Sequence, residues 1–101
     1  ADGLKCLVKV AKRSTLRLLD ISYTQIRDES ELVEQVLELP MVEQLAFCCC
    51  DLSLDQVSTI AECLPFTSVK SLDLAGNEFG SEGLVYLASK LSESMVEELD
   101  L

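Results

Sequence analysis

The sequence predicts a repeating α/β fold in which short strands and helices alternate along the chain. A pattern with large apolar residues at its first, fourth and sixth positions occurs four times, and each complete copy is followed by apolar residues at helical spacing. The copies start at Leu16, Val42, Val69 and Val96, which gives spacings of 26, 27 and 27 residues. A period of this length indicates stacked repeat units.

The apolar pattern itself predicts the strands, near residues 17–21, 43–48, 70–75 and 97–101. Side chains alternate between the two faces of a strand, so the apolar positions of each copy would face the core together. Because a helix separates each strand from the next, the strands should be parallel.

Helices are expected near residues 3–12, 29–39, 54–64 and 82–92. Apolar residues three and four positions apart share one face of a helix. Such sets are Leu4, Leu7 and Ala11, then Val57, Ile60 and Leu64, then Leu84, Leu87 and Leu91. The helix at 29–39 has a looser pattern in a shorter unit, and its apolar residues are Leu32, Val33, Val36, Leu37 and Leu39.

Polar residues and prolines mark the ends of these helices. Asp28, Ser53 and Ser81 each precede a helix and are predicted N-caps, because their side-chain oxygens can accept from a free backbone N–H. Pro40 and Pro65 fall just past a helix, where the missing N–H and the fixed φ stop its propagation.

The third copy, Val69-x-x-Leu72-x-Leu74-x-x-Asn77-x-Phe79, resembles the leucine-rich repeat signature L-x-x-L-x-L-x-x-N/C-x-L. The stretch LDLAGNEFGSEGLVYLASKL resembles the ribonuclease-inhibitor type of this family, whose units contain a full helix. We call the place of the asparagine the ladder position. In the three complete copies it is held by Thr24, Cys50 and Asn77.

The resemblance implies a leucine-rich repeat solenoid of horseshoe shape, with parallel strands on the concave face and helices on the convex face. Helices are about 10 Å wide and strands about 4.8 Å apart, so a stack of such units bends. Ladder side chains would turn inward and satisfy the backbone of the turning loop. Repeats would span 16–41, 42–68 and 69–95, with the helix of a preceding repeat in 1–15 and the strand of a further repeat in 96–101, which predicts a fragment of a longer array.

The residues between the leucines predict the binding surface, because alternation points them away from the core. The resemblance implies a non-catalytic module that binds a protein partner through the concave face. The expected contact residues are Leu18, Asp20, Ser22, Tyr23, Gln44, Cys48, Cys49, Ser71, Asp73, Glu98 and Asp100. The carboxylates among them favour a basic partner. The alternative is that these aspartates have no binding role, since an aspartate between two leucines is a common choice of the family on a solvated strand.

The composition argues against several classes of function. Eight Lys and Arg against 18 Asp and Glu leave a net charge of −10, which argues against binding nucleic acid or an anionic membrane. The chain has no histidine, which removes His-dependent catalysis and His-ligated metal. We therefore expect no enzyme activity, no cofactor and no small-molecule substrate.

The five cysteines include three adjacent ones at 48–50 and no CxxC pair. Strand alternation separates the three side chains, and tetrahedral zinc needs four converging ligands, so no metal site is expected. Free thiols favour a reducing compartment, which is the cytoplasm or the nucleus.

Other functions of the family stay open as alternatives. Some proteins with this repeat type activate a small GTPase through an arginine in a loop after a strand, and Arg27 is the base in a comparable loop. Others act as substrate adaptors of ubiquitin ligases, and a spacer inside a larger array is a further alternative.

The helix expected at 29–39 carries an acidic run, which is either a docking surface or a solvated helix face. The run comprises Asp28, Glu29, Glu31, Glu34 and Glu38.

Overall fold

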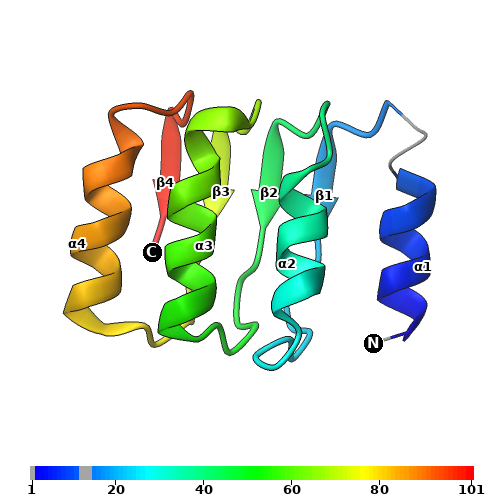
Figure 1. Cartoon of the computed structure of the whole chain (residues 1–101), viewed down its shortest axis with the longest axis horizontal. Coiled ribbons are helices and arrows are strands. Elements are labelled where there is room, and N and C mark those ends of the chain that lie inside the picture. Colours follow the sequence, from blue (N-terminus) through cyan, green and yellow to red (C-terminus); the bar gives the residue numbers. More distant parts are fainter. Residues whose placement is uncertain (1, 12–14) are drawn as a thin grey trace.

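The computed structural model describes residues 2–11 and 15–101, without the side chains of Asp2 and Leu4. Figure 1 shows helices and strands alternating along this part of the chain, as the sequence predicts. In chain order the elements are α1 (Asp2–Ala11), β1 (Leu18–Asp20), α2 (Ser30–Leu37), β2 (Gln44–Ala46), α3 (Leu54–Cys63), the 3₁₀ helix η1 (Leu64–Phe66), β3 (Ser71–Asp73), α4 (Gly80–Leu91) and β4 (Glu98–Asp100).

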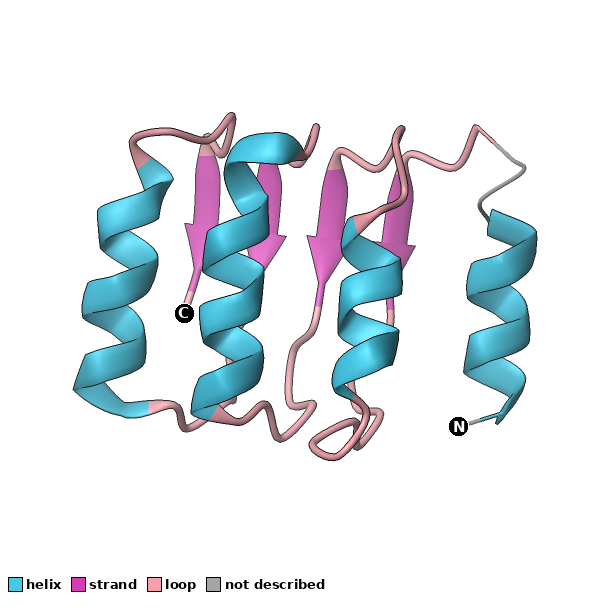
Figure 2. Ribbon diagram, in the orientation of Figure 1, coloured by secondary structure: helices cyan, strands magenta, loops and turns pink. Residues whose placement is uncertain are grey.

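The strands form one parallel sheet in the order β1-β2-β3-β4. Equivalent positions are in register: Leu19 lies opposite Leu45, Leu45 opposite Leu72, and Leu72 opposite Leu99. Figure 2 shows the helices in a second layer on one side of the sheet. One face of the sheet is therefore covered by helices and the other is open.

The hydrophobic core lies between these two layers. The central residues of the first three strands, Leu19, Leu45 and Leu72, point into it and are buried. The helix layer supplies the opposite wall, where Val57 and Ile60 of α3 are fully buried as predicted. Burying a side chain of this size stabilises the fold by roughly 1.5–3 kcal/mol. The buried residues of successive units form one continuous core.

Three residues predicted to face the core are instead exposed at the ends of the stack. Leu7 of α1 is 50% exposed, Leu84 of α4 is 44% exposed and Leu101 is 51% exposed. Figure 1 shows α1 and α4 as the outermost helices, so each packs against a neighbouring helix on one side only. Leu101 follows β4, which is the edge strand of the sheet. The side chain of Leu4, predicted to share the apolar face of α1, lies outside the described residues.

The predicted N-cap at Ser53 is confirmed. Ser53 Oγ accepts a hydrogen bond from the Gln56 backbone N–H at 3.2 Å, and Gln56 Oε1 accepts one from the Ser53 N–H at 2.9 Å. This reciprocal pair is a capping box, and it fixes the start of α3. Gln56 also donates through Nε2 to the carbonyl of Ile26 in the preceding unit, which explains why this polar side chain is buried.

The predicted N-caps at Asp28 and Ser81 are wrong. α2 is preceded by Glu29 and α4 by Phe79, and neither side chain caps its helix. Ser81 lies inside the first turn of α4, and Asp28 lies one residue before the cap position. Neither oxygen therefore stands where it would accept from the second or third helical N–H.

Candidate functional site

The open side of the sheet presents the first and third residue of every strand. We call this surface the open sheet face. In each strand these two side chains are more exposed than the central one, as the alternation of a strand requires. The open sheet face consists of Leu18, Asp20, Gln44, Ala46, Ser71, Asp73, Glu98 and Asp100. The strand register brings the predicted contact residues on the strands into two continuous rows.

Carboxylates concentrate on the β3–β4 half of the open sheet face. Asp73 lies opposite Asp100 in register, and Glu98 lies opposite Ser71. Asp20, on β1, is separated from Asp73 by the alanine of β2. Among the eight residues of the open sheet face, four are acidic and none is Lys or Arg. The surface is therefore negative, and most strongly so around Asp73 and Asp100.

Two of these carboxylates also hold the ends of their strands. Asp20 Oδ1 accepts from the Ser22 backbone N–H at 2.9 Å, and Asp73 Oδ1 accepts from the Ala75 N–H at 3.0 Å. Hydrogen bonds from Ser22 lower the pKa of Asp20, so this group stays ionised at neutral pH. Asp20 and Asp73 thus also stabilise the backbone at the ends of their strands.

Shallow hollows mark the open sheet face. One, of about 230 Å³, extends from Leu18 past Gln44 to Asp73. A second, of about 260 Å³, lies where β2, β3 and β4 begin, and its walls include Lys70 and Glu98. Among the described residues that line these two hollows, Lys70 is the one positively charged side chain. Their size and openness suit an extended contact surface better than a small-molecule pocket, which usually encloses about 300–1,000 Å³.

The remaining predicted contact residues lie where the strands end. Ser22 Oγ accepts from the Cys48 N–H at 3.0 Å, and the Tyr23 N–H donates to the Cys48 carbonyl at 2.8 Å. Tyr23 is 79% exposed, and Cys49 is exposed as well. These residues belong to the turns that follow β1 and β2, next to the carboxyl ends of the strands.

The thiols of Cys48 and Cys49 lie 3.7 Å apart. Their hydrogen bond is the main cause that raises the pKa of Cys48, so this thiol is protonated at neutral pH. Within residues 2–11 and 15–101, no group of three or more His, Cys, Asp or Glu side chains is arranged to hold a metal ion. All five cysteines are free thiols.

Two of the three ladder residues, Cys50 and Asn77, bond the backbone of their turns, as the resemblance implies. Asn77 Oδ1 accepts from the backbone N–H groups of Cys50 and Leu52, at 3.0 and 3.1 Å. Cys50 is buried, and its Sγ donates to the carbonyl of Ile21 at 3.2 Å. Burial raises the pKa of the Cys50 thiol, which keeps it protonated and able to donate. Thr24 holds the same position after β1 and is half-buried.

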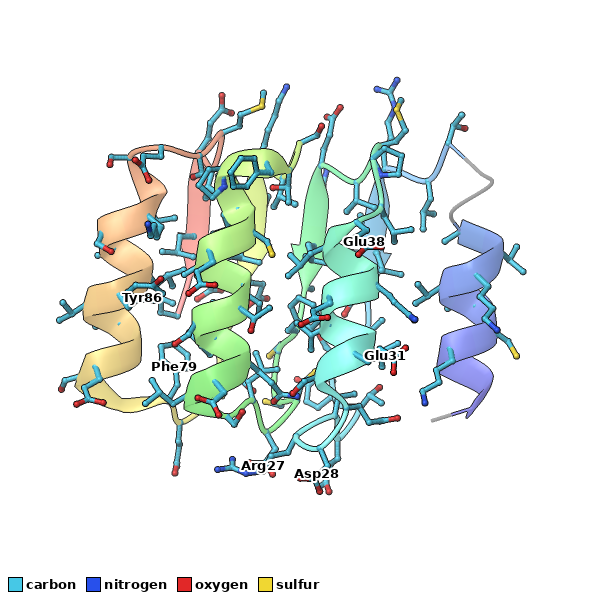
Figure 3. The ribbon with its side chains drawn as sticks, viewed as in Figure 1. Arg27, Asp28, Glu31, Glu38, Phe79 and Tyr86 are labelled. Atoms are coloured by element: carbon cyan, nitrogen blue, oxygen red, sulfur yellow. The ribbon has the colours of Figure 1, made fainter. Side chains whose placement is uncertain are left out.

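Arg27, the residue considered for a GTPase-directed role, lies in the loop between β1 and α2. Its Nη1 donates to Asp51 Oδ1 at 3.2 Å, and both side chains are more than half exposed. Figure 3 shows Arg27 beside Asp28 at the edge of the molecule, at the end where the strands lead into their turns. The structure thus places Arg27 in a surface ion pair that ties two successive turns together.

Comparison with known families agrees with this architecture. A family model described as Leucine Rich repeat matches residues 13–30 and, a second time, residues 67–88. The two matches support a leucine-rich repeat protein, and each includes a strand and the turn that follows it. Leucine-rich repeats are generally protein-interaction modules and are typically not enzymes.

No curated protein matches the chain. In the described part of the chain, no helix is long and apolar enough to cross a membrane.

Proposed function

We propose that the chain is a segment of a ribonuclease-inhibitor-like leucine-rich repeat array that binds a protein partner through the open sheet face. The observation that carries this proposal is the unbroken register of four parallel strands beneath two rows of accessible side chains. Solenoids of this kind use the inner surface of their curve for binding. Because helices are wider than the strand spacing, the open sheet face would be the concave side of a longer array.

The partner that fits this surface is basic. Asp73, Glu98 and Asp100 lie on adjacent strands, and charges on the open sheet face would attract a complementary partner and speed its association. The five free thiols support a location in the cytoplasm or the nucleus, where thiols stay reduced.

The test compares two charge reversals on opposite sides of the molecule. Glu98→Lys with Asp100→Lys changes the open sheet face, and Glu82→Lys with Glu93→Lys changes exposed positions on and after α4 by the same total charge. Asp20 and Asp73 are left intact because their reversal would also break the bonds at the strand ends. The immobilised wild-type chain captures partners from a cell lysate, and each captured protein is then titrated against both double variants.

We expect Glu98→Lys with Asp100→Lys to abolish or strongly weaken binding, and the α4 pair to leave it nearly unchanged. Added salt should weaken the wild-type complex, because screened charges attract less. Equal binding to the wild type and to the Glu98/Asp100 pair would overturn the proposal, provided that circular dichroism shows both chains folded.

A further inference from the structure

A groove of about 600 Å³ lies on the helix side of the molecule, between α2 and the C-terminal end of α3. α2 has eight residues, whereas α3 has ten and continues directly into η1. The longer helix therefore extends past the end of the shorter one. Ser68 Oγ donates to the carbonyl of Pro40 at 3.2 Å, which ties together the two loops that border this groove.

Apolar side chains make up much of the groove. Leu37 and Pro40 line it from the α2 side, and Cys63 and Phe66 line it from the α3 and η1 side. Phe66 is 90% exposed, the largest value among the exposed large hydrophobic side chains of the described residues. Burying this ring against a partner would contribute roughly 1.5–3 kcal/mol, so Phe66 is suited to anchor one.

The groove is also strongly negative. Glu34, Glu38 and Glu62 line it, and none of the residues described in its walls is Lys or Arg. The Tyr86 hydroxyl donates a hydrogen bond to Glu62 Oε1 at 2.9 Å. Burial raises the pKa of the Cys63 thiol, and the three glutamates add to that rise, as a negative field requires. Figure 3 shows Glu38 near the upper end of α2.

We propose that this groove docks a basic segment of another protein, in which a Lys or Arg side chain stands beside a large aliphatic one. The aliphatic side chain fills the space between Leu37, Pro40 and Cys63. The cation meets Glu34 and Glu62 and stacks on the ring of Phe66, where a cation over an aromatic face gains further attraction. The site lies on the helix side, so it is separate from the open sheet face and independent of the function proposed for that face.

A phage library of random short peptides, selected on the immobilised chain, supplies the probe. Three variants locate the binding site: Phe66→Ala, the pair Glu34→Gln with Glu62→Gln, and the open-face pair Glu98→Lys with Asp100→Lys. Glu82→Gln with Glu93→Gln is the matched control for lost charge. Glutamine at position 62 keeps an oxygen for the Tyr86 hydroxyl, and Phe66 is exposed, so these variants should retain the fold.

We expect selected peptides to carry Lys or Arg next to Leu, Ile or Met. Synthetic copies should bind Phe66→Ala and the Glu34/Glu62 pair roughly tenfold more weakly than wild type, which is about 1.4 kcal/mol for each change. Binding to the control pair and to the open-face pair should stay within about twofold.

Several results would overturn this assignment: no enriched peptide, enriched peptides without the basic–aliphatic pairing, or equal binding to the groove variants and the wild type. A self-associating chain that becomes monomeric on Phe66→Ala would also overturn it, because a second copy would then occupy the groove. The function proposed for the open sheet face is tested separately, by the binding of its own captured partner to the Glu98/Asp100 variant.

Discussion

The turn after β3 and the turn after β2 hold equivalent places in successive units, but their ladder residues bond differently. The side chain of Asn77 takes part in five hydrogen bonds, as acceptor in two and donor in three. The thiol of Cys50 takes part in two, to the carbonyls of Ile21 and Cys48, over 3.2 and 3.6 Å. The family signature allows either residue at this position, yet only the amide can both accept and donate strongly.

The difference shows how neighbouring units are joined. Asn77 reaches back to satisfy two N–H groups and the Phe47 carbonyl of the preceding unit, so its side chain ties units 42–68 and 69–95 together. The side-chain bonds between units 16–41 and 42–68 are instead shared among several residues. The Cys48 N–H donates to Ser22 Oγ, Cys50 Sγ donates to the Ile21 carbonyl, and Gln56 Nε2 donates to the Ile26 carbonyl. The second joint should therefore depend on one side chain far more than the first.

Asn77→Ala is expected to have the largest effect, a loss of roughly 2–4 kcal/mol in the free energy of unfolding. The N–H groups of Cys50 and Leu52 would lose their acceptor in a partly buried turn, where unpaired donors are costly. Urea unfolding followed by circular dichroism measures the loss. Glu78→Ala, at the exposed neighbouring position, is the matched control and should stay within about 0.5 kcal/mol of the wild type.

Asn77→Asp refines this test because it keeps the acceptor oxygen and removes the donor to the Phe47 and Leu74 carbonyls. Its stability should therefore fall between the wild type and Asn77→Ala near pH 4, where the carboxyl is partly protonated, and drop further at pH 7. If Asn77→Ala were no less stable than Glu78→Ala, water would be replacing the amide and the proposed contrast between the joints would be wrong.

Cys50→Ala should cost less, roughly 1–2 kcal/mol, because it removes one buried sulfur and two weak S–H hydrogen bonds. The same urea titration reports the change. Cys6→Ala, at an exposed thiol on α1, serves as the control and should be nearly neutral. A loss at Cys50 equal to that at Asn77 would show that the two ladder residues stabilise their joints alike.

The sequence predicts the architecture well because one apolar period determines both strand register and core. Leu19, Leu45 and Leu72 are in register and buried, as their spacing requires. Helix starts at α2 and α4 are predicted less well, since the path of each turn places Glu29 and Phe79 at the cap positions, and neither side chain caps its helix. α3 ends at Cys63, so Pro65 falls just past it as expected, and the chain then continues through the short 3₁₀ helix η1.

The candidate site, too, has features that the sequence predicts and features that it does not. Alternation along the strands predicts the two rows of the open sheet face, because side-chain direction is a property of the strand alone. The bonds of Asp20 and Asp73 to the backbone depend on the turn that follows each strand, and the sequence does not reveal them. The groove beside α3 is a consequence of unequal helix lengths in neighbouring units, so only the packed structure shows it.

The smallest expected effect concerns the residue just before each ladder position. Tyr23, Cys49 and Gly76 occupy this place, with φ of 65°, 54° and 76°. A left-handed conformation costs an L-residue about 1–2 kcal/mol, whereas glycine adopts it freely. Cys49→Gly should therefore raise the free energy of unfolding by roughly 0.5–1 kcal/mol, because relief of strain exceeds the added entropy of the unfolded chain.

Two further substitutions show whether backbone conformation is the cause. Gly76→Ala should lose about 1 kcal/mol, since the position demands positive φ and a Cβ there would collide with Cys49 Sγ. Cys48→Gly, at the adjacent residue with negative φ, should be destabilising because glycine there adds only unfolded-state entropy. Stabilisation by glycine at both 48 and 49 would mean that removal of the paired thiols, and not relief of strain, governs this turn.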